Sequence, residues 1–287
     1  MPPTVAIIAP GNMGAAVGGR LVQHGIAACT SLAGRSPASA ERARIFGLRA
    51  VSDEEIVAAD FVLSIVPPGD ALALAQRLVP RLRQARRKPI YVDCNAVNPD
   101  TVRRIGDVIS ATGCPFVDAG IIGGPPQPQG KGPVFYVSGP QAPAFARLAE
   151  FGLTVSVLEG PIGAASALKM SYAGCTKGLV ALGSAMMLAA TRAGAAEALQ
   201  RELARSQPAL LAWLTRMVPN MYSKAYRWVA EMEEIADFLG RDVPERKIFE
   251  GAAGLYDRLA ADEAGAGQET AALSAFLAGA NRPEGGN

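Results

Sequence analysis

The stretch VAIIAPGNMGAAVGGRLV, residues 5–22, decides the fold of the first half of this chain. A short apolar run leads into a turn containing Gly11 and Gly14, and a helical pattern follows, which is typical of a dinucleotide-binding strand–turn–helix unit. Gly11 allows the backbone to approach a pyrophosphate, Gly14 allows the helix to pack on the strand, and the first helical amides attract the anion. Ala9 stands where G-x-G-x-x-G has its first glycine, so an ordinary strand-to-helix turn is the alternative.

Strand and helix patterns alternate through the N-terminal half, and helical patterns alone follow. The predicted strands are 5–9, 27–33, 61–66, 90–93, 116–119 and 134–138, and the helices between them are 14–24, 37–46, 53–59, 70–84 and 99–112. Later helices are predicted at 162–192, 194–218, 219–239, 244–261 and 268–279. The order predicts an α/β fold: a Rossmann-like, doubly wound parallel sheet in residues 1–160, followed by an all-α domain in residues 161–287.

The composition narrows the classes of partner. The chain has 287 residues, 49% of them hydrophobic, and a net charge of +2, so we expect two folded domains and no nucleic-acid partner. One histidine, His24, and four scattered cysteines predict neither a metal site nor a disulfide framework, and favour a cytoplasmic location. Residue 5 already begins a core strand, so no signal peptide is expected. The apolar run 177–192 is too short to span a bilayer and predicts a buried helix, with no membrane partner.

The end of the second predicted strand indicates which dinucleotide is bound. The sequence there is Ala33-Gly34-Arg35-Ser36, with no acidic residue until Glu41. NAD sites place a carboxylate at this point for the ribose 2′-OH, whereas Arg and small hydroxyl residues suit a 2′-phosphate. We therefore expect NADP rather than NAD, with a plain turn arginine as the alternative reading of Arg35.

Two later strand ends complete the predicted cofactor site. Val66-Pro67-Pro68 and Asn95 follow strands whose carboxyl ends meet at the ligand-binding edge of a doubly wound sheet, although either feature is equally consistent with a structural turn. The expected cofactor contacts are Gly11, Asn12, Met13, Gly14, Arg35, Ser36, Val66, Pro67 and Asn95.

One lysine in an apolar helical segment is the candidate catalytic group. Lys169 follows a glycine-containing turn, and Ser166, Tyr172, Ala173 and Thr176 share its face at helical spacing. A lysine placed beside a cofactor can donate a proton to a developing alkoxide or accept one from a hydroxyl, and an unremarkable exposed lysine is the alternative. Upstream, a strand leads into Gly123-Gly124, whose backbone amides could hold a small anion or a carbonyl.

Taken together, these residues resemble the β-hydroxyacid dehydrogenase and 6-phosphogluconate dehydrogenase superfamily along nearly the whole chain. In its G-x-x-G-x-G-x-x-x-K-x-x-x-N motif, Gly160, Gly163 and Lys169 match, whereas Ala165 replaces a glycine and Ala173 the asparagine. Its substrate-binding D-x-P-V-S-G-G motif appears here as residues 118–124, with Ile122 in place of the serine. The segment after Lys169 is similar to a branch in which this NADP domain precedes a helical domain of unknown function.

The resemblance implies an NADP-dependent oxidoreductase that moves hydride between nicotinamide and an alcohol or carbonyl carbon, with Lys169 as general acid/base. Expected substrate contacts are Ile122, Gly123, Gly124, Tyr172, Ala173 and Thr176, around a small substrate less polar than a simple 3-hydroxy acid. Tyr172, Thr176 or Lys177 could replace the missing asparagine. The alternatives are an imine reductase acting on cyclic imines and a non-catalytic NADP-binding module. The resemblance also implies a homodimer formed through the helical domain, whose first helix contains Gly174, Gly178 and Gly183.

Overall fold

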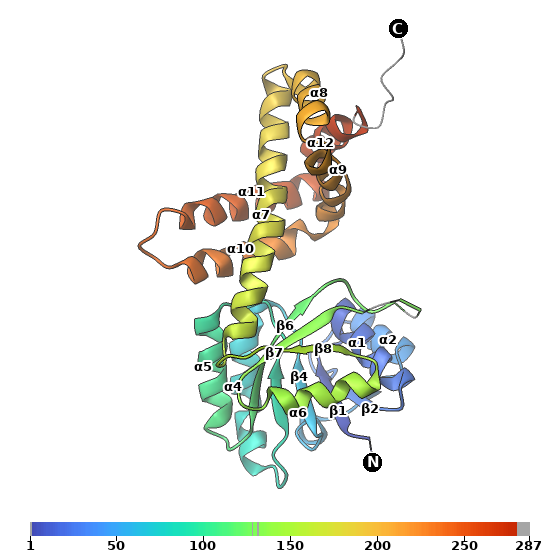
Figure 1. Ribbon diagram of the computed structural model, residues 1–287. Coiled ribbons are helices and arrows are strands. Elements are labelled where there is room, and N and C mark those ends of the chain that lie inside the picture. Colours follow the sequence, from blue (N-terminus) through green and yellow to red (C-terminus); the bar gives the residue numbers. More distant parts are fainter. Residues whose placement is uncertain (1, 128, 131, 280–287) are drawn as a thin grey trace. The chain divides into compact units, whose positions relative to one another are not determined.

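The chain folds into two compact units, Met1–Met170 and Ser171–Asn287. The computed structural model describes residues 2–127, 129–130 and 132–279. Its first unit holds an eight-stranded sheet with helices, and the described part of the second unit is helical (Figure 1). The expected fold class is therefore confirmed. The division between the units falls within the long helix Ala164–Arg192, about ten residues after the boundary expected at residue 160.

The sheet is doubly wound about its first strand. Its order is β3-β2-β1-β4-β5-β6-β7-β8, and every neighbouring pair is parallel except β6 and β7. The strands are β1 (Thr4–Ile8), β2 (Ala27–Thr30), β3 (Arg49–Ala50), β4 (Phe61–Ser64), β5 (Ile90–Asp93), β6 (Phe116–Ile122), β7 (Val134–Ser138) and β8 (Thr154–Val157). Since β2 and β4 flank β1 on opposite sides, the order reverses there, and ligands bind beyond the carboxyl ends of strands at such a point.

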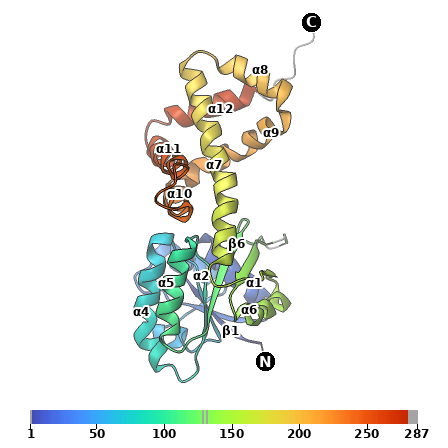
Figure 2. The same ribbon diagram turned by 60° about the vertical axis from the view of Figure 1, so that its left-hand side comes forward.

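Helices cover both faces of the sheet and separate two hydrophobic cores. The alternation along β1 assigns Val5 and Ile7 to one core and Ala6 and Ile8 to the other. The first core includes α1 (Asn12–Gln23), α2 (Pro37–Ile45) and α6 (Ala142–Ala146); the second includes α3 (Asp53–Ile56), α4 (Ala71–Gln84) and α5 (Pro99–Ser110). Figures 1 and 2 both show α4 and α5 side by side on one face of the sheet. Short 3₁₀ helices, Pro68–Asp70 and Arg147–Phe151, complete this unit.

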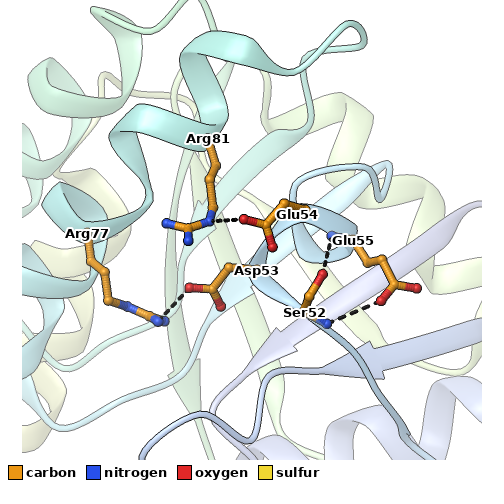
Figure 3. A network of polar contacts seen from close by, with 6 residues as sticks. All are labelled: Ser52, Asp53, Glu54, Glu55, Arg77 and Arg81. Atoms are coloured by element: carbon orange, nitrogen blue, oxygen red, sulfur yellow. Dashed lines mark hydrogen bonds and ion pairs between the residues drawn. The ribbon is translucent and has the colours of Figure 1, made fainter.

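The four-residue helix α3 is held in place by polar contacts that Figure 3 shows in detail. Ser52 accepts a hydrogen bond from the amide of Glu55, whose side chain accepts one from the amide of Ser52, so the two form a capping box. Two ion pairs connect α3 to α4: Asp53 with Arg77 at 2.6 Å and Glu54 with Arg81 at 2.8 Å. Helix α3 thereby packs its buried Ile56 into the second core.

The helical unit begins within the long helix α7 (Ala164–Arg192), which starts in the first unit. The remaining helices are α8 (Ala196–Ser206), α9 (Pro208–Met217), the 3₁₀ helix Pro219–Lys224, α10 (Ala225–Leu239), α11 (Arg246–Ala264) and α12 (Gln268–Gly279). The single helices predicted at 194–218 and 219–239 were wrong. The first contains a break before Pro208, because proline disfavours helical geometry in the residue before it, and Gln207 is non-helical there. The second divides into the 3₁₀ helix Pro219–Lys224 and α10, with the backbone of Lys224 outside α-helical geometry at their junction.

Helix α7 is buried on one side only, which corrects the expectation of a fully buried helix. Gly174 and Gly178 lie against the ring of Phe249 from α11, where an added Cβ would come within 3.3 and 3.1 Å of it. The opposite side exposes apolar residues at three- and four-residue spacing. By length and a mean hydropathy of 1.4, α7 is the one described helix that could cross a membrane, which is weak evidence because core helices of soluble proteins have the same properties.

Candidate functional site

The turn between β1 and α1 has the geometry of a pyrophosphate site. Helix α1 begins at Asn12, two residues earlier than predicted. Gly11 is its N-cap and has no side chain to bond the first amides. An added Cβ at Gly11 would meet nothing within 4 Å, whereas one at Gly14 would lie 2.1 Å from the carbonyl oxygen of Ala9. Gly14 is therefore required for packing, and Gly11 leaves open space before uncapped helical amides, as an anion requires.

Arginine and serine side chains cluster where β2 leads into α2. Ser36 caps α2, accepting a hydrogen bond from the amide of Ser39 at 3.3 Å, and the two hydroxyls lie 3.2 Å apart. Arg42 donates to the Ser39 hydroxyl at 3.0 Å and to the carbonyl oxygen of Pro10 at 3.2 Å. Arg42 thus connects this cluster to the glycine turn, and Arg35, one residue before Ser36, is exposed. Sequence reasoning missed it, although the three-residue spacing of 36, 39 and 42 places all three on one helical face.

The first acidic residue after this cluster is used elsewhere. Glu41 forms a two-point ion pair with Arg44 at 2.6 and 2.9 Å on the exposed side of α2. Its pKa is lowered by the hydrogen bond from Arg44. The cluster itself therefore presents guanidinium and hydroxyl groups, a chemistry that suits a phosphate better than a ribose hydroxyl pair.

Asn95 joins the carboxyl ends of β4 and β5. Its Oδ1 accepts from the amide of Val66 at 2.7 Å, and its Nδ2 donates to the Ser64 hydroxyl and to Asp93, each at 2.8 Å. The residue is buried, and both Nδ2 protons are used by these contacts. Asn95 therefore fixes the position of Val66-Pro67, and its own contact with a cofactor stays a prediction.

The carboxylate beside Asn95 is unusual in its protonation. Asp93 lies fully buried on β5, and burial raises its pKa to about 7. Hydrogen bonds from the amide and side chain of Asn95 oppose that rise, whereas the charge of Asp118 on the neighbouring strand adds to it. The end of β5 therefore carries a group that titrates near neutral pH.

Lys169 lies at the carboxyl end of β6. Its Nζ donates a hydrogen bond to the carbonyl oxygen of Ile121 at 2.8 Å, and its side chain is partly buried. The helix approaches the strand closely at Gly120, where an added Cβ would lie 2.8 Å from the carbonyl oxygen of Ala165 and 3.1 Å from Cβ of Lys169. Gly120 stands where the related motif has proline, and the missing side chain lets the helix and strand pack directly.

The expected substrate loop begins immediately after this contact. Ile122 ends β6, and Gly123 follows with φ of 125°, a conformation that favours glycine. Gly124 has nothing within 4 Å of an added Cβ, so its backbone borders open space. The structure thus brings together Lys169, Ile122 and the two glycines at one edge of the sheet. A polar side chain is absent at 122, and polar recognition there falls to backbone groups.

The other expected substrate residues lie in the helical unit. Tyr172 is half exposed and Ala173 is buried, while the Thr176 hydroxyl donates to the carbonyl oxygen of Tyr172 at 2.8 Å. Lys177 forms an ion pair with Glu231 and lies 4.8 Å from the ring centroid of Trp228. Lys177 is thus bound within its own unit, which weakens its candidacy as a substitute for the missing asparagine.

The histidine, cysteine and carboxylate side chains that the structure describes do not form a metal site. No group of three or more His, Cys, Asp or Glu residues in the described ranges could hold a metal ion. His24 forms a hydrogen bond with the carbonyl oxygen of Arg20, at 2.8 Å from Nδ1. All four cysteines are free, and only Cys175 is exposed.

Comparison with known proteins matches both units. Residues 4–153 match the NAD binding domain of 6-phosphogluconate dehydrogenase, and residues 190–259 match a domain of unknown function. An uncharacterized 28.5 kDa protein of Methanothermus fervidus is 32% identical over 155 residues, which are 53% of this chain and 57% of that protein. The match thus spans little more than half of that relative.

Solved structures extend the similarity to nearly the full chain. A conserved protein of unknown function, described as structurally similar to 3-hydroxyacid dehydrogenases, is 32% identical with a TM-score of 0.69, covering 89% of this chain and 96% of that one. The 3-hydroxyisobutyrate dehydrogenase of Mycobacterium tuberculosis, solved with L-serine, has a TM-score of 0.71 at 20% identity, covering 98% and 100%. An imine reductase of Myxococcus stipitatus in complex with NAD+ scores 0.51 at 20% identity, covering 96% and 100%.

The last two similarities concern the fold alone, whereas the domain match and the 32% identical structure identify the family. The chain belongs to the family that shares the NAD binding domain of 6-phosphogluconate dehydrogenase, in the branch that carries the helical domain of unknown function.

Proposed function

We propose that this protein is an NADP-dependent oxidoreductase acting on the alcohol or carbonyl group of a small, rather apolar or hydroxyacid-like substrate. The observation that carries the proposal is the position of Lys169, whose Nζ is held on the Ile121 carbonyl beside Gly123-Gly124 in a dinucleotide-binding domain. When bound, the nicotinamide supplies or accepts the hydride. The chain's own residues must then bind the cofactor, orient the substrate and move one proton.

The residues present fit such a cofactor. The open space at Gly11 and the uncapped amides of α1 suit a pyrophosphate, and Arg35, Ser36 and Arg42 suit a 2′-phosphate. Val66 and Pro67, held by Asn95, would border the nicotinamide half. These features support NADP over NAD.

Lys169 would act as the general acid/base. In reduction, Nζ donates a proton to the carbonyl oxygen as the alkoxide forms, and in oxidation it accepts the proton of the hydroxyl. The backbone groups of Gly123 and Gly124 would orient the substrate. Ile122 leaves an apolar surrounding beside these glycines, which supports a substrate less polar than a simple 3-hydroxy acid.

Replacing Lys169 tests this role. Lys169→Met keeps most of the side-chain volume and should lower turnover by roughly 10²–10⁴-fold while NADPH binding, followed by fluorescence, stays unchanged. Lys88→Met is the matched control, because Lys88 is also held on backbone carbonyls, those of Leu82 and Arg83, yet lies elsewhere in the same unit. Turnover that survives in Lys169→Met would show that another group moves the proton.

A second candidate function is imine reduction. The apolar Ile122 supports it, because an imine needs no carboxylate anchor, whereas retention of Lys169 favours a carbonyl substrate. Assaying NADPH oxidation with ethyl 5-oxohexanoate and with 2-methyl-1-pyrroline, and NADP+ reduction with 3-hydroxyisobutyrate, separates the two. Cofactor binding without turnover on any of these compounds would favour the non-catalytic alternative.

We also propose that α7 mediates a homodimer. The four free cysteines support a reducing compartment such as the cytoplasm as its location. Gly174, Gly178 and Gly183 pack against Phe249 and Leu214 of the same unit, so they are not available to a partner. The free face instead consists of apolar residues that are 37–60% exposed: Tyr172, Leu179, Leu182 and Met186. Leu182→Glu should convert the dimer into a monomer of 29.7 kDa in analytical ultracentrifugation, and a wild-type monomer would refute the assignment.

A further inference from the structure

The carboxylate of Asp118 is fully buried on β6 and accepts five hydrogen bonds. Three come from the backbone amides of Gly163, Ala165 and Ser166, at 2.8, 3.1 and 3.1 Å, and all reach the same oxygen, Oδ2. The other two come from the hydroxyls of Ser138, at 2.9 Å, and Ser166, at 2.7 Å. Asp118 thus binds protein groups at the start of α7, although it occupies the first position of the motif expected to hold substrate.

These amides are the ones that a helix leaves without partners at its N-terminus. The first turn of α7 has unpaired N–H groups and a partial positive charge, and a carboxylate satisfies both. Here the acceptor comes from a strand 45–48 residues earlier in the sequence, so the contact also joins α7 to the sheet. Ser138 on β7 donates to Asp118 and accepts from the amide of Ala165 at 3.0 Å, which ties the next strand to the same turn.

Lys169 lies one helical turn beyond these contacts. Residues of β6 contact α7 at three successive points. Asp118 accepts hydrogen bonds from the first amides of α7, and Gly120 packs against Ala165 and Lys169. The carbonyl oxygen of Ile121 accepts a hydrogen bond from Nζ of Lys169. We propose that Asp118 is a positioning residue that sets the depth and rotation of α7 on β6, and thereby the place of Lys169 Nζ at the site. The assignment rests on the proposed role of Lys169.

A direct measurement of the lysine tests the geometry without any substrate. Competitive acetylation of the full-length protein by acetic anhydride, followed by digestion and mass spectrometry, measures the reactivity of Lys169 relative to Lys88. Asp118→Asn removes the negative charge toward which the three amides of Gly163, Ala165 and Ser166 point, so the hold on the start of α7 should weaken. We expect Lys169 in this variant to react about fivefold faster than in the wild type, because its hold on the Ile121 carbonyl is weakened. Lys88 should be unchanged.

Asp93→Asn is the matched control. Asp93 is an equally buried carboxylate at the register-paired position of β5, but its contacts are with Asn95 rather than α7. The control should leave Lys169 reactivity at the wild-type value even if it changes stability. A purely structural role of Asp118 would lower the unfolding temperature and leave Lys169 reactivity in the folded protein unchanged, and that result would overturn the proposal.

Two further measurements distinguish a failure of the positioning role of Asp118 from a failure of the catalytic role of Lys169. If Asp118→Asn does not fold, Ser166→Ala and Ser138→Ala each remove one bond to the carboxylate and should raise Lys169 reactivity by a smaller factor; no rise in either would overturn the proposal. With ethyl 5-oxohexanoate and NADPH, Asp118→Asn should lower kcat about tenfold and leave KM for NADPH unchanged, since the glycine turn is intact. Turnover by Lys169→Met would refute the catalytic role alone, because the labelling still measures the position of the lysine.

Discussion

Replacing Asp93 by asparagine is expected to remove a loss of stability that the wild-type protein suffers as pH rises. The carboxyl group is fully buried at the end of β5, and burial raises its pKa from 3.8 to about 7. Between these two values the folded protein keeps the proton that the unfolded chain has lost. The folded state therefore binds more protons in this window, and the free energy of unfolding falls as pH increases.

The size of the effect follows from the two pKa values. Each tenfold difference in acid dissociation is worth about 1.4 kcal/mol, so moving the pKa from 3.8 to about 7 costs about 4 kcal/mol once the pH exceeds 7. Over a third of this cost is already present at about pH 5, because the unfolded chain is ionised there. Between about pH 5 and about pH 8.5, the cost grows by about 3 kcal/mol.

The amide side chain introduced by Asp93→Asn carries no titrating proton. Its NH₂ group would face the N–H donors of Asn95, which lowers the free energy of unfolding by the same amount at every pH. The assay is urea unfolding of both proteins at the two pH values. Far-UV circular dichroism is the suitable signal, since both tryptophans, Trp213 and Trp228, lie in the helical unit. The stability of Asp93→Asn relative to wild type should rise by about 3 kcal/mol from the lower to the higher pH. Parallel pH dependence in the two proteins would refute the reasoning.

Three further substitutions test the cofactor side of the site, and a fourth tests its glycine packing. Gly11→Ala should fold with wild-type stability, because its Cβ meets nothing within 4 Å, yet NADPH affinity measured by fluorescence should fall at least about tenfold. Gly14→Ala should lower the unfolding temperature and the yield of folded protein, because its Cβ would lie 2.1 Å from the Ala9 carbonyl oxygen. Asn95→Ala removes the partner of the Val66 amide and should cost about 2–3 kcal/mol in urea unfolding. Arg42→Ala should weaken NADPH binding roughly tenfold and leave NADH binding unchanged.

Most of the sheet could be predicted from the sequence because its central strands are continuous apolar runs. Two strands were missed for a physical reason. The residues of β3, Arg49 and Ala50, are both exposed, and β8 is a half-buried edge strand, so neither carries the apolar signal of a buried strand. The boundary at Pro219 was predicted, whereas the break before Pro208 was missed although proline disfavours helical geometry before it, because the helical pattern continues on either side.

The candidate site was predictable where its chemistry depends on local sequence. A glycine turn and a basic strand end act through neighbouring residues, so Gly11, Gly14 and Arg35 stand out without a structure. The roles of Asn95 and Asp118 depend instead on strand pairing. Asn95 bonds Val66, 29 residues away, and Asp118 bonds amides that follow it by 45–48 residues. No spacing rule relates such positions, because the sheet topology alone brings them together.

The pattern of retained and replaced residues bears on what the site can recognise. Lys169 is retained, and two structural features, the missing side chain of Gly120 and the carboxylate of Asp118, hold its helix against β6. The polar side chain that the related motif places at 122 is replaced by Ile122, while Gly123 and Gly124 leave their backbone accessible. Transferring a proton to one substrate oxygen needs only Lys169 held in place. Binding a second, charged group of the substrate needs a polar side chain such as the one the related motif has at 122. A site that keeps the lysine but has an apolar side chain at 122 offers a substrate carboxylate no polar side chain there, which supports the proposed preference for substrates whose only essential polar group is the one that reacts.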